Sequence, residues 1–297
     1  MRRSADVHFE TRDLFGRFAV SSLLFPGSLV AHSVAMLSRS TAVLWHAAYR
    51  RTVLAAFNTV PFYRQRWALE GRTEPTLVEG RTGTHDGASH PEELLRVLVD
   101  LVPLAGGEAE YDPARGLGQV LPVARRPRSG TLVVIVDREI TRPPADLPNG
   151  VRGAALHPDL FAGAEESAVV AELLGALRRR RPVLAVGGDK ELSGLISVLP
   201  AESSHLVYRL PHRSVSDLDG ALYGVLHDPL LGYLGALREC GRWHLDHRRV
   251  YARRTRGGLA FTLLKQRSPM FVDVLVDGGV RGDVRWCPRH GTPVVST

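Results

Sequence analysis

The 297-residue sequence contains only two cysteines, Cys240 and Cys287, and only two lysines, Lys190 and Lys265. Two cysteines cannot build a disulfide framework, and no secretory leader pattern opens the chain, so the sequence predicts a cytoplasmic protein. Aromatic residues make up 7% of the chain, hydrophobic residues make up 44%, and the mean hydropathy is -0.06. This composition is typical of a folded protein and excludes both a disordered chain and a multi-span membrane protein.

Long apolar runs are also scarce. One uncharged stretch of 21 residues, 18–38, has the length of a membrane span, but it contains Pro26-Gly27, His32 and five serines. These residues are poorly suited to hydrocarbon. The stretch predicts two short packed amphipathic elements that are broken at the Pro-Gly pair, and no membrane span.

The positive charge is almost entirely arginine. The 38 Lys and Arg residues exceed the 31 Asp and Glu residues and give a net charge of +7. The arginines are spread along the sequence with one short run, 178–181, which follows the apolar stretch 168–177 and reads as the charged end of a helix. Because the basic residues are not interleaved with aromatics, the sequence predicts no nucleic-acid partner.

The order of apolar patterns predicts an α/β protein in three parts. Residues 1–68 form an N-terminal helical region, since apolar residues recur at helical spacing over 30–67. Residues 69–244 form an α/β core, in which two buried strands are each followed by a helical pattern. Residues 245–297 form a small, mainly antiparallel β-subdomain of short β-like runs.

Within the core, the predicted elements are short. The strands are 131–136 and 182–186, and the helices are 91–101, 165–178 and 189–199. Residues 106–130 are rich in Gly, Pro and Arg and are expected to be irregular, and 143–158 reads as a Pro-rich connector.

The strongest local signal pairs each cysteine with a histidine within one turn, as Cys240-x-x-x-His244 and Cys287-x-x-His290. Two thiolates and two imidazoles form a complete tetrahedral set for zinc. The 42 residues between the two pairs exceed the length of a simple finger, so a structural zinc would tie the start of the β-subdomain to its end. The alternative is that the cysteines are merely small buried residues.

Two further patterns each allow two interpretations. The loop 80–87, which includes Thr82, Gly83 and Thr84, could cradle phosphate ahead of the helix at Pro91, or it could be a solvated turn-rich loop. Asp277 could accept hydrogen bonds from ribose hydroxyls at a strand end, or it could form an Asp-Gly hairpin turn with the next residue.

Several segments follow one another in an order that resembles the large domain of the phenylacetate-CoA ligase branch of the adenylate-forming superfamily. They are VPFYR at 60–64, TGTHDG at 82–87, RPVLAV at 181–186, the pair at 240–244, TLL at 262–264, Ser-Pro at 268–269, and CPRHGTP at 287–293. The resemblance covers residues 50–293. It implies an adenylate-forming α/β large domain, nucleotide contacts from Thr82, Gly83, Thr84, Tyr223 and Asp277, and zinc on the Cys/His pairs.

The sequence also departs from the pattern of that family. Asp86 places a carboxylate in the phosphate loop, where it would repel phosphate. His227 replaces the acid that holds magnesium in the family, and neither lysine lies where the adenylation lysine of the C-terminal lid domain would be needed. We therefore expect ATP, AMP and magnesium to bind weakly at best.

The resemblance and the departures together predict a truncated homologue that acts in a biosynthetic pathway. It would bind a carboxylic acid or an acyl thioester for acyl activation or transfer, with His227 and Asp228 as the acid/base pair. The alternative is a non-catalytic accessory or carrier protein that docks an acyl group or a partner enzyme.

Overall fold

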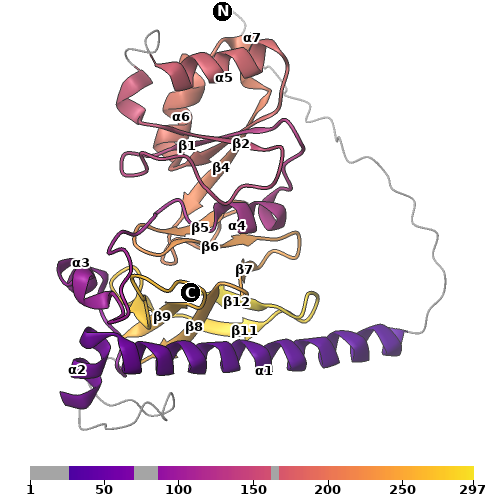
Figure 1. Cartoon of the computed structure of the whole chain (residues 1–297). Coiled ribbons are helices and arrows are strands. Elements are labelled where there is room, and N and C mark those ends of the chain that lie inside the picture. Colours follow the sequence, from indigo (N-terminus) through magenta and orange to yellow (C-terminus); the bar gives the residue numbers. More distant parts are fainter. Residues whose placement is uncertain (1–26, 70–85, 162–166) are drawn as a thin grey trace, which may run out of the picture.

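The computed structural model describes residues 27–69, 86–161 and 167–297. Within these residues, a nine-stranded mixed sheet and a three-stranded antiparallel sheet are packed with helices (Figure 1). The protein is therefore a mixed α/β protein, as the order of apolar patterns predicted.

The α/β half of the large sheet consists of five parallel strands in the order β2-β1-β3-β4-β5. The predicted strands 131–136 and 182–186 form β1 and β3, which are buried along their whole length. The five strands are β1 (Leu132–Val136), β2 (Arg152–Leu156), β3 (Val183–Gly187), β4 (Val207–Arg213) and β5 (Val225–Asp228). Their helices are α5 (Ala168–Arg178), α6 (Asp189–Val198) and α7 (Ala201–Ser204). Because the strands are parallel, their carboxyl ends meet at one edge and their amino ends at the other.

The same sheet continues through four antiparallel strands, which are β6 (Gly232–Leu237), β7 (Trp243–Leu245), β12 (Pro293–Ser296) and β11 (Asp283–Trp286). The three-stranded sheet consists of β8 (Val250–Thr255), β9 (Gly258–Leu263) and β10 (Val274–Leu275). The strands of the predicted β-subdomain are antiparallel, but they are divided between the two sheets, and the sheet of the α/β half runs into that region without interruption.

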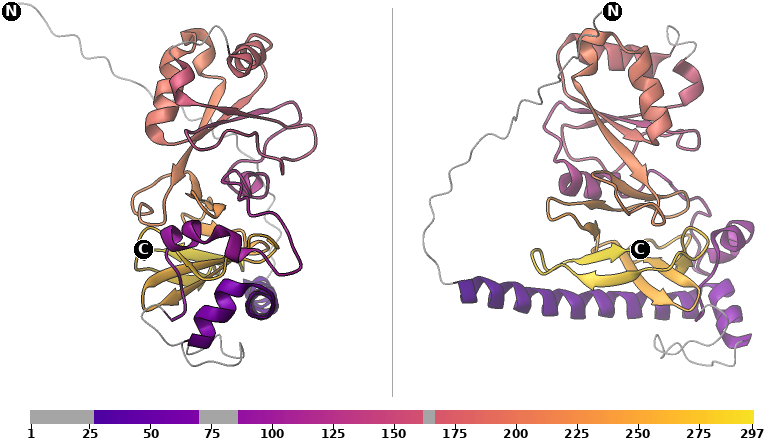
Figure 2. Two further views of the ribbon diagram at one scale, coloured as in Figure 1. Left: turned by 60° about the vertical axis from the view of Figure 1, so that its left-hand side comes forward. Right: turned by 180° about the vertical axis from the view of Figure 1, so that it is seen from behind.

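The N-terminal helices are α1 (Gly27–Thr59) and α2 (Pro61–Leu69), and α1 lies along the strands of the C-terminal region (Figure 2). One face of α1 is buried there. Trp45 donates a hydrogen bond to the Val250 carbonyl at 2.8 Å, and the rings of Tyr49 and Tyr251 stack with their centroids 3.9 Å apart. Pro61 begins α2, two residues after the end of α1. The expected break at Pro26-Gly27 lies at the margin of the described residues, and α1 begins at Gly27. None of the helices in the described ranges is both long and apolar enough to span a membrane.

The segment 106–130, which we expected to be irregular, contains a helix, α4 (Leu117–Ala124). Leu117, Val120 and Leu121 are buried against the large sheet, so tertiary packing outweighs the weak local signal of a segment that also contains Pro122. The remaining short helices are α3 (Pro91–Arg96) and the 3₁₀ turns η1 (Leu98–Leu101) and η2 (Pro158–Phe161). The predicted helix 91–101 thus divides into α3 and η1.

A buried carboxylate joins α1 to the three-stranded sheet. Asp273 is fully buried and accepts hydrogen bonds from the Tyr49 hydroxyl at 2.8 and 2.9 Å and from Arg253 at 3.0 and 3.1 Å. The Thr262 hydroxyl donates to it at 3.2 Å. Burial acts to lower the pKa of Arg253, but Asp273 and Tyr49 outweigh burial and raise that pKa. Both charges are therefore paired inside the fold.

The end of α5 has an unusual residue in a common motif. The amide of Arg181 bonds to the Ala176 carbonyl at 2.9 Å and that of Arg180 to the Leu177 carbonyl at 2.8 Å, which is the Schellman pattern. The motif needs a left-handed residue, usually glycine, but here it is Arg180, with φ of 53°.

Replacing Arg180 with glycine should therefore stabilise the protein. The Cβ penalty of the left-handed region would disappear, and we expect a gain of about 0.5–1 kcal/mol in the unfolding free energy, measured by urea denaturation. Arg179→Gly is the matched control: that residue has φ of -83°, so the added chain entropy should make this variant less stable. Loss of stability in both variants would contradict the interpretation.

Candidate functional site

The Cys/His pairs lie in or beside the turns that join neighbouring strands of the large sheet. Cys240 lies between β6 and β7, and His244 is the central residue of β7. Cys287 directly follows β11, and His290 lies in the turn before β12. Since β12 pairs with β7, with Val294 opposite His244, the sheet brings the two turns together.

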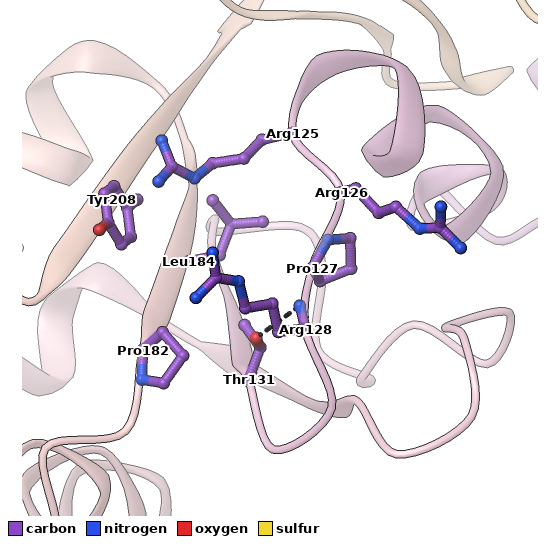
Figure 3. Close-up of a pocket in the computed structure, with 8 residues that line it drawn as sticks. All are labelled: Arg125, Arg126, Pro127, Arg128, Thr131, Pro182, Leu184 and Tyr208. Carbon is purple, nitrogen blue, oxygen red and sulfur yellow. Dashed lines mark hydrogen bonds between the residues drawn. The ribbon is translucent and has the colours of Figure 1, made fainter. Parts of the chain in front are cut away.

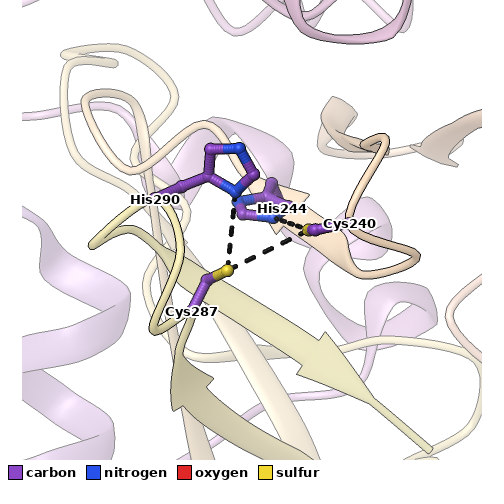
Figure 4. A group of neighbouring side chains, drawn as sticks. All are labelled: Cys240, His244, Cys287 and His290. Atoms are coloured by element: carbon purple, nitrogen blue, oxygen red, sulfur yellow. Dashed lines mark hydrogen bonds between the residues drawn. The ribbon is translucent and has the colours of Figure 1, made fainter. Parts of the chain in front are cut away.

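The four side chains point toward one another and place one ligand atom each around a common centre (Figure 4). The Cys240 sulfur lies 3.1 Å from His244 Nε2 and 4.0 Å from the Cys287 sulfur, which lies 3.5 Å from His290 Nδ1. All four atoms lie within 4.8 Å of one another. A tetrahedral zinc ion requires ligand atoms about 3.3–3.8 Å apart, so these side chains could hold a metal ion with little adjustment.

The other ring nitrogen of each histidine is also held. His244 Nδ1 lies 2.7 Å from the Thr292 hydroxyl, and His290 Nε2 lies 2.9 Å from a Glu239 carboxylate oxygen. Contacts of this kind fix the tautomer and the orientation of a metal-binding imidazole. They leave His244 Nε2 and His290 Nδ1 facing the sulfurs.

Glycine shapes both turns. Gly241 follows Cys240 with φ of 69°, and Gly291 follows His290 with φ of 60°. In the second turn the amide of Gly291 bonds to the Cys287 carbonyl at 2.8 Å, which folds the chain back over the sulfur. The left-handed glycines therefore let each pair curl around one centre.

The protonation states also suit a metal. Burial, assisted by the charge of Arg238, lowers the pKa of His244 to about 4, so its imidazole is neutral at pH 7. Burial also acts to raise the pKa of Cys287, but hydrogen bonds with His290 and the backbone lower it overall. Burial raises the pKa of Cys240 in the metal-free chain. A divalent ion would neutralise two thiolates and leave no net charge in the largely buried cluster.

A second polar cluster lies at the carboxyl edge of the parallel strands. His212 of β4 and His227 of β5 stack with their ring centroids 4.3 Å apart. The Tyr233 hydroxyl lies 2.8 Å from His212 Nε2, and Asp137, directly after β1, lies 3.8 Å from His212 Nδ1. Ligands of open α/β sheets bind outside this edge. We call these four residues the histidine cluster.

The contacts of His227 indicate which of its ring nitrogens carries the proton. Its Nε2 lies 3.0 Å from the Pro113 carbonyl, which can only accept, so Nε2 carries the proton and Nδ1 does not. Nδ1 has no hydrogen-bond partner among the described residues. Burial lowers the pKa of His227 and lowers that of His212 still further, so both rings are neutral at pH 7.

Asp228, which we expected to be the acid/base partner of His227, instead makes hydrogen bonds within its own turn. Its carboxylate accepts the amides of Leu230 and Leu231, both at 2.9 Å, and so caps the turn from β5 to β6. Burial raises the pKa of Asp228, although these amides oppose the rise. Adjacent strand residues project to opposite faces, and the structure gives no contact between the two side chains.

Of the remaining predicted site residues, the structure describes Tyr223 and Asp277. Thr82, Gly83 and Thr84 lie outside the described residues. Tyr223 is exposed. Asp277 has φ of 48° and is followed by Gly278 with φ of 69°, and the amide of Gly279 bonds to the Val276 carbonyl, so the residue occupies an Asp-Gly turn. Its carboxylate accepts the Ser216 amide at 2.8 Å.

Sequence reasoning missed His212, Asp137 and Tyr233. Each lies in or directly after a strand. No clear strand pattern marks β4 or β6 in the sequence, so no motif placed these residues near His227. Comparison with known proteins adds no name to either cluster: no family model matches the chain, and no curated protein matches its sequence.

Proposed function

We propose that the cluster of Cys240, His244, Cys287 and His290 is a structural zinc site. The observation that carries this proposal is the set of four ligand atoms within 4.8 Å, in which each histidine is also held by an outer contact. Four protein ligands leave no open position for substrate, which is typical of structural rather than catalytic zinc. The ion would fasten the turn before β7 to the turn before β12.

We propose further that the chain is a homologue of adenylate-forming enzymes and binds a carboxylic acid or an activated acyl group at the carboxyl edge of β1, β4 and β5. Support comes from the order of motifs along the sequence and from the histidine cluster at that edge. His227 supplies the general base through Nδ1. The acyl donor would be a preformed thioester or adenylate, because Asp86 and His227 replace groups that serve ATP and magnesium in that family.

Offering acyl thioesters and acyl adenylates without nucleotide, and following hydrolysis or transfer by mass spectrometry, tests this function. His227→Gln should lower the rate by about 10²–10⁴-fold, as expected for loss of a general base. Because the pKa of His227 is lowered, the acid limb of the pH-rate profile should lie below the ordinary histidine value of about 6.5. His205→Gln, a change at an exposed histidine, is the matched control and should leave the rate unchanged.

One observation favours the non-catalytic alternative, an accessory or carrier protein that docks an acyl group or a partner enzyme. Asp228 is committed to a turn, so His227 lacks the partner that the sequence suggested. Absence of turnover with every activated donor, together with measurable binding of an acyl ligand, would support this alternative. Turnover that strictly requires ATP would contradict our assignment of the acyl donor.

A further inference from the structure

The amino edge of the parallel strands carries a concentration of arginine that the sequence did not reveal. Two hollows, of about 290 and 660 Å³, lie at this edge and share Pro182 in their walls. Six arginines line them, and all six are exposed: Arg125, Arg126, Arg128, Arg152, Arg180 and Arg181. We call this surface the arginine edge. No acidic residue lines either hollow.

The six arginines of this edge are nearly as many as the seven basic residues by which Lys and Arg exceed Asp and Glu in the whole sequence. Taking six arginines from the 38 Lys and Arg residues leaves 32, against 31 Asp and Glu residues. These six arginines lie where three segments that are separate in the sequence meet. These segments are 125–131 before β1, 150–152 at the start of β2, and 180–182 before β3.

Most of these arginines have no charged partner in the protein. Arg152 lies 3.6 Å from Glu172, and the other five form no ion pair with any residue that the structure describes. The guanidinium of Arg125 lies over the Tyr208 ring at 3.5 Å, and Arg128 points toward the same hollow (Figure 3). Guanidinium groups without charged partners present donors in the fork geometry that matches carboxylates.

Arg180 adds an independent observation. It occupies the left-handed position of the α5 cap, where glycine would be more stable. Because arginine at this position lowers the stability of the protein, we take its side chain to serve binding rather than folding.

From these observations we infer that the arginine edge is a docking surface for an acidic protein partner that presents several carboxylates across both hollows. A small ligand would occupy one hollow, whereas the arginines line two that are joined at Pro182. The surface is at the opposite edge of the strands from the histidine cluster. The inference therefore does not depend on the proposed acyl chemistry.

The composition of the surface disfavours other polyanions. Single-stranded nucleic acid binds through exposed aromatic platforms, but Tyr208 is the one aromatic residue in the two linings, and the guanidinium of Arg125 lies over its ring. A membrane surface site would expose large apolar side chains beside the cations. Tyr208 is the one large exposed hydrophobic residue among these lining residues as well.

Binding of three probes by the full chain tests the inference: a glutamate-rich helical peptide, a single-stranded oligonucleotide of equal charge, and vesicles containing phosphatidylglycerol. We expect the peptide to bind most tightly, and its affinity to fall about tenfold or more between low and physiological salt. Tighter binding of the oligonucleotide or the vesicles would overturn the inference, as would the absence of peptide binding.

Two changes locate the interaction. Arg125→Gln with Arg128→Gln, in the first hollow, should weaken peptide binding at least about fivefold. Arg180→Gly, in the second hollow, should weaken it about threefold while making the protein more stable, a combination that partial unfolding cannot produce. Arg267→Gln with Arg281→Gln removes two exposed charges elsewhere and should leave binding within about twofold. Equal loss of binding in this control would overturn the assignment to the arginine edge.

Discussion

Removing the metal should lower the unfolding free energy of the protein by about 4 kcal/mol, since a ligand present at about 1,000 times its dissociation constant contributes this much to the folded state. Protein prepared without chelator should contain about one equivalent of zinc by elemental analysis. Addition of a strong chelator should then lower the midpoint of thermal unfolding. The effect is large because the ion joins the turn before β7 to the turn before β12, which are otherwise joined by the pairing of short strands and by a few side-chain hydrogen bonds.

Variants of the site separate metal binding from general damage. Cys240→Ser with Cys287→Ser should lose both the metal and the response to chelator. Thr292→Val should keep the metal but bind it about 10–100-fold more weakly, because the outer contact of His244 would be lost. His205→Gln should behave like the unmodified protein. Metal analysis that finds no zinc in chelator-free protein, or a double variant of unchanged stability, would contradict the structural role.

Asp273→Asn should cost about 3–5 kcal/mol of unfolding free energy. The change leaves Arg253 largely buried without its carboxylate and weakens the hydrogen bonds from Tyr49 and Thr262. Asparagine tolerates the left-handed conformation that Asp273 adopts, with φ of 51°. The loss of stability would therefore come from removing the charge and not from backbone strain. Denaturation by urea gives the value directly.

Two further substitutions allow the loss of stability from Asp273→Asn to be compared with smaller changes. Tyr49→Phe removes a single buried hydrogen-bonding group and should cost about 1–1.5 kcal/mol. Asp283→Asn breaks the more exposed pair with Arg285 and should cost less than Tyr49→Phe. A loss from Asp273→Asn no larger than that from Asp283→Asn would mean that the buried pair does not hold α1 to the three-stranded sheet.

The sequence predicted the α/β class because 131–136 is a continuous β-branched run and 182–186 is a second apolar run, and a helical pattern follows each of them along the chain. It also predicted the metal cluster, because two cysteines that each have a histidine within one turn form a pattern that needs no tertiary information. The pairing of β7 with β12 was not needed to recognise the ligands, although it is what brings them together.

Other features depend on contacts that no local pattern records. Strand β2 has the sequence RGAAL, which carries little strand preference, and it forms only because β1 offers it a parallel edge. Asp273 lies within an apolar run, and no pattern in the sequence connects it with its buried partners on α1 and β8. Likewise, the arginine edge is assembled by the parallel sheet from three separate segments between residues 125 and 182, so the order of residues along the chain does not show it.

The connection of β7 to β12 also bears on the order of events during synthesis. Four strands, β8 to β11, are made between these two partners, so the edge of β7 stays open while they emerge from the ribosome. Over this interval Cys240 and His244 form half of a metal site, and an unpaired strand edge invites association with other nascent chains. Capture of the ion by Cys287 and His290 would close that interval and make the final pairing difficult to reverse.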